Sequence, residues 1–239
     1  MKKSLGVLLT SAIITSTAAE AQQIRSWSGY KANVNCGLPK RDSMRVLPNG
    51  NLRVILRDGD KGKCRTDPKP WHTPQWFKPY SERAELVIRK RLRDGREHHI
   101  SFEAKWMQGY LETGRNENIF QIKGCESSGQ VAVLAFLRRA ARNKEFMFYV
   151  GSQDTHTAKA PFGLHYDTWF KFDIYYRNGP RNSNLTVKMN GKPIVENIKF
   201  RRVKTCGNNR LRLGLYRGGS PDGRKLKTTE VEYRNLKIK

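Results

Sequence analysis

Residues 81–89 read Ser-Glu-Arg-Ala-Glu-Leu-Val-Ile-Arg and alternate between two kinds of side chain. A period of two is that of a β-strand, in which successive side chains point to opposite faces. One face carries Ala84, Leu86 and Ile88. The other face carries Arg83, Glu85, Val87 and Arg89. The stretch therefore predicts a strand that buries one side in a core and presents fixed charges on the other.

Two later segments have the same design. Residues 121–124 read Gln-Ile-Lys-Gly, and residues 211–216 read Leu-Arg-Leu-Gly-Leu-Tyr. In the second segment, Arg212 and Tyr216 share a face that is opposite to the three leucines. Three strands of this kind predict a groove that binds an acidic polymer.

Short alternating segments recur along the rest of the chain, at residues 52–57, 98–106, 119–123, 130–137, 145–150, 169–176, 185–189 and 230–238. Helical periodicity is almost absent, and no internal sequence repeat is found. Many short strands at regular spacing predict an all-β fold. We expect an antiparallel β-sandwich of jelly-roll type.

Turn signals indicate how some of these strands connect. Asn190-Gly191 is a strong signal for a two-residue β-hairpin. Residues 93–96, Arg-Asp-Gly-Arg, predict a tight turn. This turn would make residues 98–106 the partner of the strand at residues 81–89. The segments on either side of the basic turn 138–144 are interpreted as a hairpin, with a short helix over residues 134–144 as the alternative.

The N-terminus has the three parts of a secretory signal peptide. Two early lysines form a basic region, residues 5–14 form a short apolar run, and Ala19-Glu20-Ala21 is a cleavage signal. We expect residues 1–21 to be removed and residues 22–239 to form a single β-jelly-roll domain. No other apolar run approaches the roughly 20 residues of a membrane helix, so we expect a secreted or periplasmic protein without a membrane partner.

The charge balance points to a polyanionic partner. The chain has 46 Lys and Arg residues against 21 Asp and Glu residues, a formal net charge of +25. Such an excess fits an acidic polysaccharide, a nucleic acid or an anionic membrane. Nucleic acid conflicts with export and lacks a recognised helix or RNP-type signature, so we expect an acidic polysaccharide and no nucleic acid. Paired carboxylates flanking a groove are not evident, which disfavours a glycoside hydrolase.

Four cysteines lie after the expected cleavage site, at Cys36, Cys64, Cys125 and Cys206. In an exported chain they are expected to form two disulfides, and three pairings are open. We favour Cys36–Cys64, within the N-terminal loop region, and Cys125–Cys206, which would tie two distant strands. A zinc site is disfavoured because no close C-x-x-C spacing and no histidine pair occur. We expect no cofactor and no catalytic metal, and a structural calcium ion is left open.

Residues 60–80 are rich in lysine, proline and aromatic residues, and include Trp71, His72, Trp76 and Tyr80. An exposed loop of this composition can bind sugar rings on its aromatic faces. A loop folded over the edge of the core is an equal alternative.

The motifs on these strands resemble those of the jelly-roll polysaccharide lyases, which include alginate lyases, glucuronan lyases and the first type of heparin lyase. The alginate-lyase pattern R-[ST]-E-L-R is similar to residues 83–87, Arg-Ala-Glu-Leu-Val. The pattern Q-[IV]-H is similar to residues 121–123, and Y-F-K-A-G-x-Y to residues 210–216. Order and spacing agree, and the similarity spans most of residues 52–239. The resemblance implies a jelly-roll fold and β-elimination on a uronic-acid polymer.

The chain departs from these patterns at three positions. Val87 replaces the last arginine of the first pattern. Lys123 stands where the family's alginate and heparin lyases place a histidine, so the usual base is absent there. Gly218 stands where the family has a final glutamine, which leaves the particular uronic acid unassigned.

The resemblance also implies roles for the residues that match. In β-elimination a base removes the proton on C5 beside the carboxylate, and an acid protonates the departing oxygen at C4. The carboxylate must be neutralised because the intermediate carries its charge there, and Arg83, Gln121 and Lys123 suit this task. Arg212 completes the predicted substrate-binding set together with Glu85, which is expected to form an ion pair that orients Arg83 or Arg212.

Tyr216 is expected to be the acid, and also the base if both protons move on the same side. Lys123 could serve as the base only as a neutral amine, with its pKa lowered by burial or by nearby cations, so the role of cationic neutraliser is simpler. His72 is the first candidate for the base, followed by Tyr216 alone and then by His165. The non-catalytic alternatives are a solvated loop histidine for His72 and an ordinary packed tyrosine for Tyr216.

Two functions follow from these observations. The first is an exported, monomeric polysaccharide lyase that cleaves a uronic-acid-containing polymer by β-elimination. The second is a non-catalytic module that binds acidic polysaccharide and kept the groove after losing the family histidine.

Overall fold

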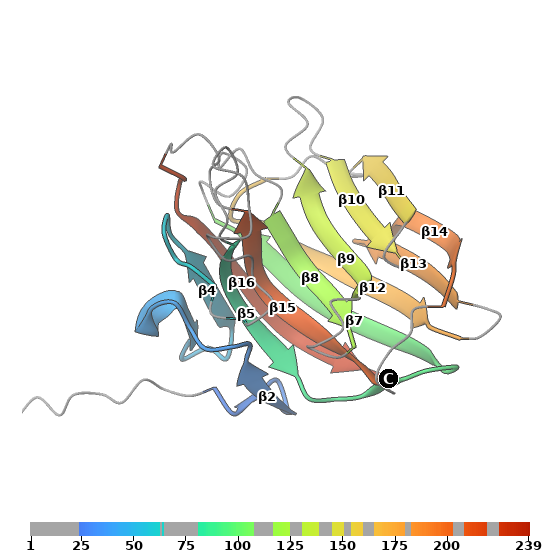
Figure 1. Ribbon diagram of the computed structural model, residues 1–239, viewed down its shortest axis with the longest axis horizontal. Helices are drawn as coiled ribbons and strands as arrows, with labels where there is room; N and C mark the ends of the chain where they lie inside the picture. Colours follow the sequence, from blue (N-terminus) through green and yellow to red (C-terminus); the bar gives the residue numbers. More distant parts are fainter. Residues whose placement is uncertain are drawn as a thin grey trace, which may run out of the picture.

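The computed structural model describes residues 24–62, 64, 81–107, 117–124, 131–138, 145–150, 154–159, 165–179, 183–202, 208–218 and 225–239. These residues form two antiparallel β-sheets packed face to face (Figure 1). Within this part of the chain the only helical element is the 3₁₀ turn η1 (Arg41–Ser43). The predicted all-β, jelly-roll type of sandwich is therefore confirmed. None of the described residues belongs to a helix that is long and apolar enough to cross a membrane.

The first sheet contains the strand predicted at residues 81–89, which is β5 in the structure. Its order is β1 (Ser26–Trp27), β2 (Tyr30–Val34), β5 (Ser81–Ile88), β15 (Asn208–Gly218), β8 (Glu117–Lys123), β9 (Val131–Arg138), β10 (Glu145–Val150) and β11 (Asp154–Lys159), and β6 (Leu92–Arg93) also pairs with β15. Strands that are far apart in the sequence are thus neighbours, since β15 lies between β5 and β8.

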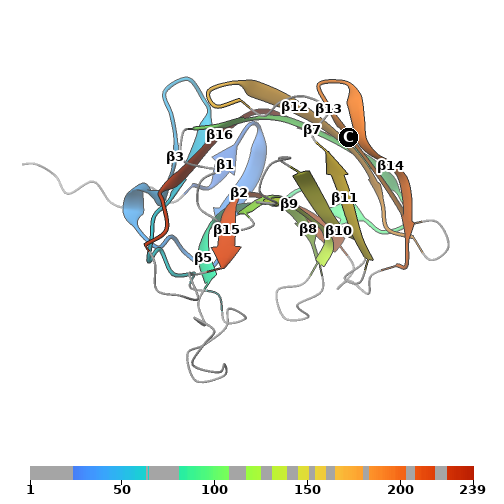
Figure 2. The same cartoon turned by 90° about the horizontal axis from the view of Figure 1, so that it is seen from above.

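The second sheet has the order β14 (Lys192–Phe200), β13 (Ser183–Met189), β12 (Trp169–Arg177), β7 (Glu97–Trp106), β16 (Thr229–Ile238), β4 (Leu52–Leu56) and β3 (Met44–Val46). Figure 2 shows this sheet arching over the first one. The alternating strands of both sheets point their apolar side chains into the space between the layers, as expected for a sandwich.

The core between the sheets is rich in aromatic rings. Phe102 of β7 packs on Phe172 of β12, with ring centroids 5.4 Å apart, and meets Phe120 of the opposite sheet edge-on at 5.8 Å. Tyr233 of β16 donates its hydroxyl to the carbonyl of Ile119 at 2.8 Å, and the carbonyl of Gly214 lies 3.1 Å away. Burial raises the pKa of Tyr233, so this hydroxyl stays protonated and links the two sheets.

Two predicted hairpins are confirmed. Asn190 and Gly191 join β13 to β14 with φ angles of 48° and 80°, and the left-handed conformation at both turn positions is the reason for the Asn-Gly pair. Strands β9 and β10 pair antiparallel with Arg138 opposite Glu145, so the alternative of a helix starting at residue 134 is wrong for the described residues.

One predicted connection is wrong. Strand β7, which covers the predicted residues 98–106, does not pair with β5 but lies in the other sheet between β12 and β16. The chain crosses between the layers after β5, so both strands turn their apolar faces to the same core. A tight-turn signal does not distinguish a hairpin from such a crossing, because both need a change of chain direction. The sequence patterns do not predict the strands β1, β2, β3, β6 and β11.

A disulfide joins Cys36 and Cys64, as predicted. It ties the loop that follows β2 to a position 28 residues further along the chain. Cys125 and Cys206 lie outside the described residues. Among the residues that are described, no group of three or more His, Cys, Asp or Glu side chains is placed to hold a metal ion.

Candidate functional site

The predicted site residues lie on three adjacent strands, β5, β15 and β8. The apolar side chains of these strands are buried in the core, among them Ala84, Leu86, Phe120, Ile122, Leu211, Leu213 and Leu215. The opposite surface of the three strands, here called the site face, carries the polar and charged residues that were predicted to form the site. Alternation therefore places Arg83 and Glu85 of β5, Arg212 and Tyr216 of β15, and Gln121 and Lys123 of β8 on this face.

The strand register brings side chains of the site face into rows. Tyr216 pairs with Arg83 of β5 on one side and with Asn118 of β8 on the other. Arg212 pairs with Gln121, and Arg210 pairs with Lys123. Because directly opposite residues in an antiparallel pair project from the same face, these groups are neighbours.

Glu85 is the centre of a buried hydrogen-bond network. Its Oε2 accepts from Nη1 of Arg83 at 3.0 Å and from Nδ2 of Asn35 at 3.1 Å, and its Oε1 accepts from Nε2 of Gln121. The Glu85 side chain is 3% exposed and that of Arg83 is 8% exposed. The predicted ion pair thus forms with Arg83, and it holds both Arg83 and Gln121 in fixed positions.

Tyr216 is held between Arg83 and Ser81. The guanidinium carbon of Arg83 lies 4.1 Å from the centre of the Tyr216 ring, a cation–π contact. The Tyr216 hydroxyl lies 3.2 Å from Oγ of Ser81, and either oxygen can donate. Tyr216 is half-buried on the site face and does not belong to the hydrophobic core, which argues against the interpretation as an ordinary packed tyrosine.

Gly214 allows β15 to approach β5 closely. Its φ is +141°, and a Cβ atom at this position would lie 2.2 Å from the carbonyl oxygen of Ala84. The pairing of β15 with β8 is irregular between Leu213 and Tyr216. A glycine is therefore required where β15 passes Glu85, and no side chain separates Arg212 from Tyr216 along the site face.

The site face is strongly cationic. Arg83, Arg212 and Lys123 are 7%, 3% and 8% exposed, and Glu85 is the acidic residue among the predicted site residues. Charges that are shielded from water interact more strongly than charges on an open surface. The face is therefore suited to hold a carboxylate, and Lys123 adds a cation where the resemblance leads one to expect a histidine.

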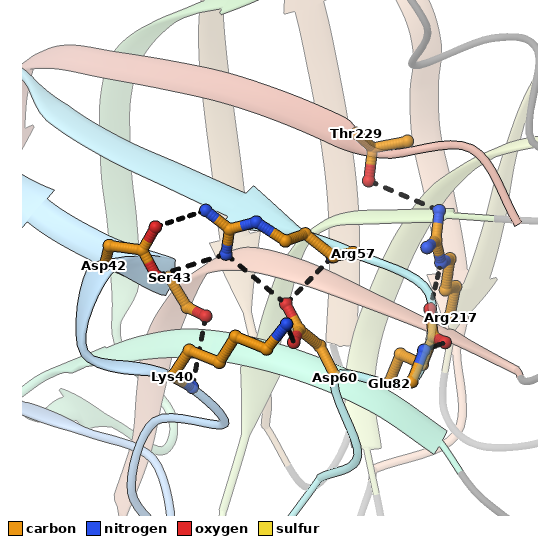
Figure 3. A network of polar contacts seen from close by, with 9 residues as sticks. Lys40, Asp42, Ser43, Arg57, Asp60, Glu82, Arg217 and Thr229 are labelled. Atoms are coloured by element: carbon orange, nitrogen blue, oxygen red, sulfur yellow. Dashed lines mark hydrogen bonds and ion pairs between the residues drawn. The ribbon is translucent and has the colours of Figure 1, made fainter.

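A buried ionic cluster lies directly behind this row of residues. Arg217, the residue after Tyr216, has a fully buried side chain whose Nε donates to Glu82 at 2.6 Å and whose Nη1 donates to Glu117 at 3.0 Å. Figure 3 shows Arg217 next to Glu82 and Thr229. Burial raises the pKa of Glu82, although Arg217 opposes this effect. The cluster fixes the register of β5, β15 and β8 and hence of the site face.

The described histidines of β7 are not on the site face. His98 is buried, with Nε2 3.1 Å from the carbonyl of Arg93. His99 lies on the solvent side of the second sheet, with Nε2 3.0 Å from Oδ1 of Asp173. His165 is exposed. The first candidate for the base, His72, lies outside the described residues, so its role stays a prediction.

A polar hollow of about 360 Å³ lies on the solvent side of the second sheet and is separate from the site face. Its carboxylates are already engaged, because Asp173 contacts His99 and Lys171, and Glu103 accepts from Arg234. Burial alone would raise the pKa of Asp173, but the hydrogen bonds from Lys171 and His99 outweigh it and hold this pKa below its ordinary value. We assign no chemistry to this hollow.

Sequence reasoning missed three residues at the site. Asn35 follows β2 and reaches Glu85 with its side chain, while its backbone N–H donates to the carbonyl of Glu85 at 2.8 Å. Ser81 and Asn118 are brought beside Tyr216 by the strand register. No motif marks Asn35, whereas Ser81 has the same strand parity as Arg83 and could have been included.

Comparison with known proteins supports the fold. No family model matches the chain, and no curated protein matches it in sequence. Among solved structures, an endo-β-1,4-glucuronan lyase from the fungus Trichoderma reesei matches with a TM-score of 0.58 at 11% identity, over 90% of this chain and 93% of its own. The alginate lyase Aly36B matches with a TM-score of 0.58 at 12% identity, over 86% of each chain.

Other matches have the same character. An alginate lyase from Pseudomonas aeruginosa matches with a TM-score of 0.57 at 15% identity, over 83% of this chain and 86% of its own. A sialidase matches with a TM-score of 0.55 at 13% identity, but this chain spans only 17% of the sialidase's length. The chain thus has the jelly-roll fold of polysaccharide lyases, as the strand motifs predicted.

Proposed function

We propose that this protein is an exported polysaccharide lyase that cleaves a uronic-acid-containing polymer by β-elimination. The observation that carries the proposal is the arrangement on the site face, where Arg83 contacts the Tyr216 ring and is held, with Gln121, by the buried Glu85. The similarity to alginate and glucuronan lyases supports the fold that this chemistry would use. An acidic polysaccharide also fits the net charge of +25.

The proposed chemistry begins with neutralisation of the substrate carboxylate. The proton on C5 is weakly acidic until donors stabilise the charge that develops on the adjacent carboxylate. Arg83, Arg212 and Lys123 supply positive charge, and Gln121 supplies an amide. Since Glu85 fixes Arg83 and Gln121 before substrate arrives, these groups need little rearrangement during the reaction.

The proton transfers are assigned to Tyr216 and a base. The base takes the C5 proton, the electrons of that C–H bond form the C4=C5 double bond, and the C4–O bond breaks. Tyr216 gives its proton to the departing oxygen. His72 is the proposed base. In the alternative, Tyr216 acts alone as phenolate, takes the C5 proton and passes it to the leaving oxygen on the same side.

The test is incubation of the full chain with glucuronan, alginate and heparin-type polymers. A lyase produces an unsaturated uronic acid, which is followed by the ultraviolet absorbance of the new conjugated double bond. Product from one of these polymers supports the proposal. Product whose new ends lack the double bond would indicate hydrolysis and contradict it.

A non-catalytic acidic-polysaccharide-binding module is the second candidate. It is favoured by Lys123 at the position of the family histidine, together with the placement of His98 and His99 away from the site face. Binding of several acidic polymers without any unsaturated product would support the module. Where unsaturated product does form, a His72→Ala variant tests the base: loss of turnover with retained binding assigns the base to His72, and full turnover removes His72 and leaves Tyr216 and His165 as candidates.

A further inference from the structure

Asn118 occupies the site face because of a bulge in β8. The pairing of β8 with β9 shifts between Asn118 and Phe120, and the pairing with β15 is irregular at the same level. As a result Ile119 and Phe120 both lie in the core, each 1% exposed. A β-bulge re-aims the side chains next to it, so Asn118 faces the same way as Gln121 despite their odd spacing.

The neighbouring contacts confirm this orientation. Arg217 pairs with Glu117 in the strand register, and the two side chains form an ion pair on the inner side of the sheet. The next pair, Tyr216 and Asn118, must therefore project to the opposite side, because successive residues of a strand alternate. Arg83, Tyr216 and Asn118 form one row across three strands, with the phenol in the middle.

The Asn118 amide is buried without a partner. Asn118 is 5% exposed, and within the part of the chain that the structure describes its Nδ2 has no hydrogen-bond partner. The amide of Gln121, by contrast, donates to Glu85. A buried donor that is left unsatisfied destabilises a protein, and native structures keep few such groups without a reason.

We infer that Asn118 is a substrate-binding residue whose side-chain amide donates a hydrogen bond to the uronate carboxylate held beside Tyr216. The inference rests on the proposed function and deepens it. The carboxylate is attached to C5, next to the proton that is transferred, so a donor one strand away from Tyr216 is within reach of it. The substrate then satisfies the amide that the free protein leaves without a partner.

The test compares Asn118→Leu and Asn118→Asp with the unmodified protein. Leucine has nearly the shape of asparagine and no donor, so Asn118→Leu should weaken binding of glucuronan or alginate oligosaccharides by about 10- to 100-fold, the range of one hydrogen bond to a charged group. Asn118→Asp places a carboxylate against the substrate carboxylate and should weaken binding further. Binding is measured by calorimetry in the Tyr216→Phe background, which prevents turnover.

Thermal unfolding of the free protein shows whether Asn118 contacts substrate or stabilises the fold. Removal of an unsatisfied buried amide should leave the melting temperature of Asn118→Leu unchanged or raise it, whereas loss of a structural contact would lower it. Asn184→Leu, on β13 of the other sheet, is the matched control and should change neither property. Unchanged oligosaccharide binding by Asn118→Leu, or weaker binding accompanied by a lower melting temperature, overturns the inference.

The outcome also separates this inference from the proposed function. Unsaturated product from the unmodified protein, with unchanged binding by Asn118→Leu, would leave the lyase standing and remove Asn118 from the site. Weaker binding by Asn118→Leu in a protein that forms no product would support the Asn118 contact in a binding module. Absence of oligosaccharide binding by the unmodified protein contradicts both.

Discussion

Tyr216 is the residue on which the proposed chemistry depends. Its hydroxyl is near Ser81 and its ring lies against Arg83, so removal of the hydroxyl leaves the cation–π contact in place. We expect Tyr216→Phe to abolish turnover and to leave polymer binding nearly intact. The measurement is the rate of double-bond formation together with oligosaccharide binding. Full activity of this variant would remove Tyr216 from the mechanism, and Tyr175→Phe, on the other sheet, is the control.

Gly214 gives a second prediction for a single residue. Gly214→Ala places a Cβ atom 2.2 Å from a backbone oxygen at a φ of +141°, so β15 must move away from β5. We expect a loss of at least about 2 kcal/mol in the free energy of unfolding, from backbone strain and overpacking together. Denaturant unfolding measures it. Gly218→Ala, in the same strand with no atom within 4 Å of its added Cβ, should stay within about 0.5 kcal/mol of the unmodified protein.

At the scale of elements, Arg217 joins β15 to both of its neighbours. Arg217→Met leaves Glu82 and Glu117 buried without their cation, a change that costs about 3–5 kcal/mol in the free energy of unfolding. Arg57→Met, in the neighbouring contacts of Figure 3, removes an ion pair with the exposed Asp42 and a longer one, at 3.9 Å, with the buried Asp60. Because Asp60 keeps its contact with Lys40 at 3.6 Å, we expect a smaller loss of about 1 kcal/mol. Equal losses for the two variants, measured by denaturant unfolding, would contradict this assignment.

Asp173, on β12 of the second sheet, should make the stability of the folded protein depend on pH. The pKa of Asp173 on β12 is lowered, because hydrogen bonds from Lys171 and His99 outweigh burial. A lowered pKa in the folded state stabilises the protein above the unfolded value of 3.8, and this contribution is lost as the pH falls through the folded value. Asp173→Asn should therefore be less stable than the unmodified protein at neutral pH, and the difference in stability should shrink as the pH falls below the unfolded value of 3.8. A constant difference would contradict the expected titration.

At the scale of the whole molecule, one disulfide is described and a second is predicted. Cys36–Cys64 is present, and Cys125–Cys206 stays a prediction. The register supports that prediction, since Lys123 at the end of β8 lies opposite Arg210 near the start of β15, and the two cysteines follow and precede these residues. Peptide mapping without reduction should recover both pairs as linked peptides. A Cys125 peptide that carries a free thiol would contradict the second pair.

The sequence predicts which face a side chain occupies where the answer depends on one strand alone. Alternation alone separated Leu86 from Glu85 and Leu213 from Tyr216, because side-chain direction in a strand depends only on parity. Alternation does not predict a contact that depends on which second strand pairs with the first, or on a bulge that changes the parity. Strand β5 pairs with β15, which lies more than a hundred residues further along the chain, and Asn118 reaches the site face only because the bulge in β8 changes the parity. Asn35 reaches Glu85 through a loop, for which no periodicity exists.

The amino-acid sequence by itself determined the all-β class, the two hairpins and the polar face of each central strand, and it favoured the pairing of Cys36 with Cys64 among three possible pairings. These properties depend on local chemistry: side-chain alternation, turn residues and the redox behaviour of thiols. Only the tertiary structure decided that Arg83, Gln121, Asn35 and Glu85 form one network and that Asn118 lies beside Tyr216. The physical reason is that these contacts join strands distant in the chain, and their register is set by packing across the core.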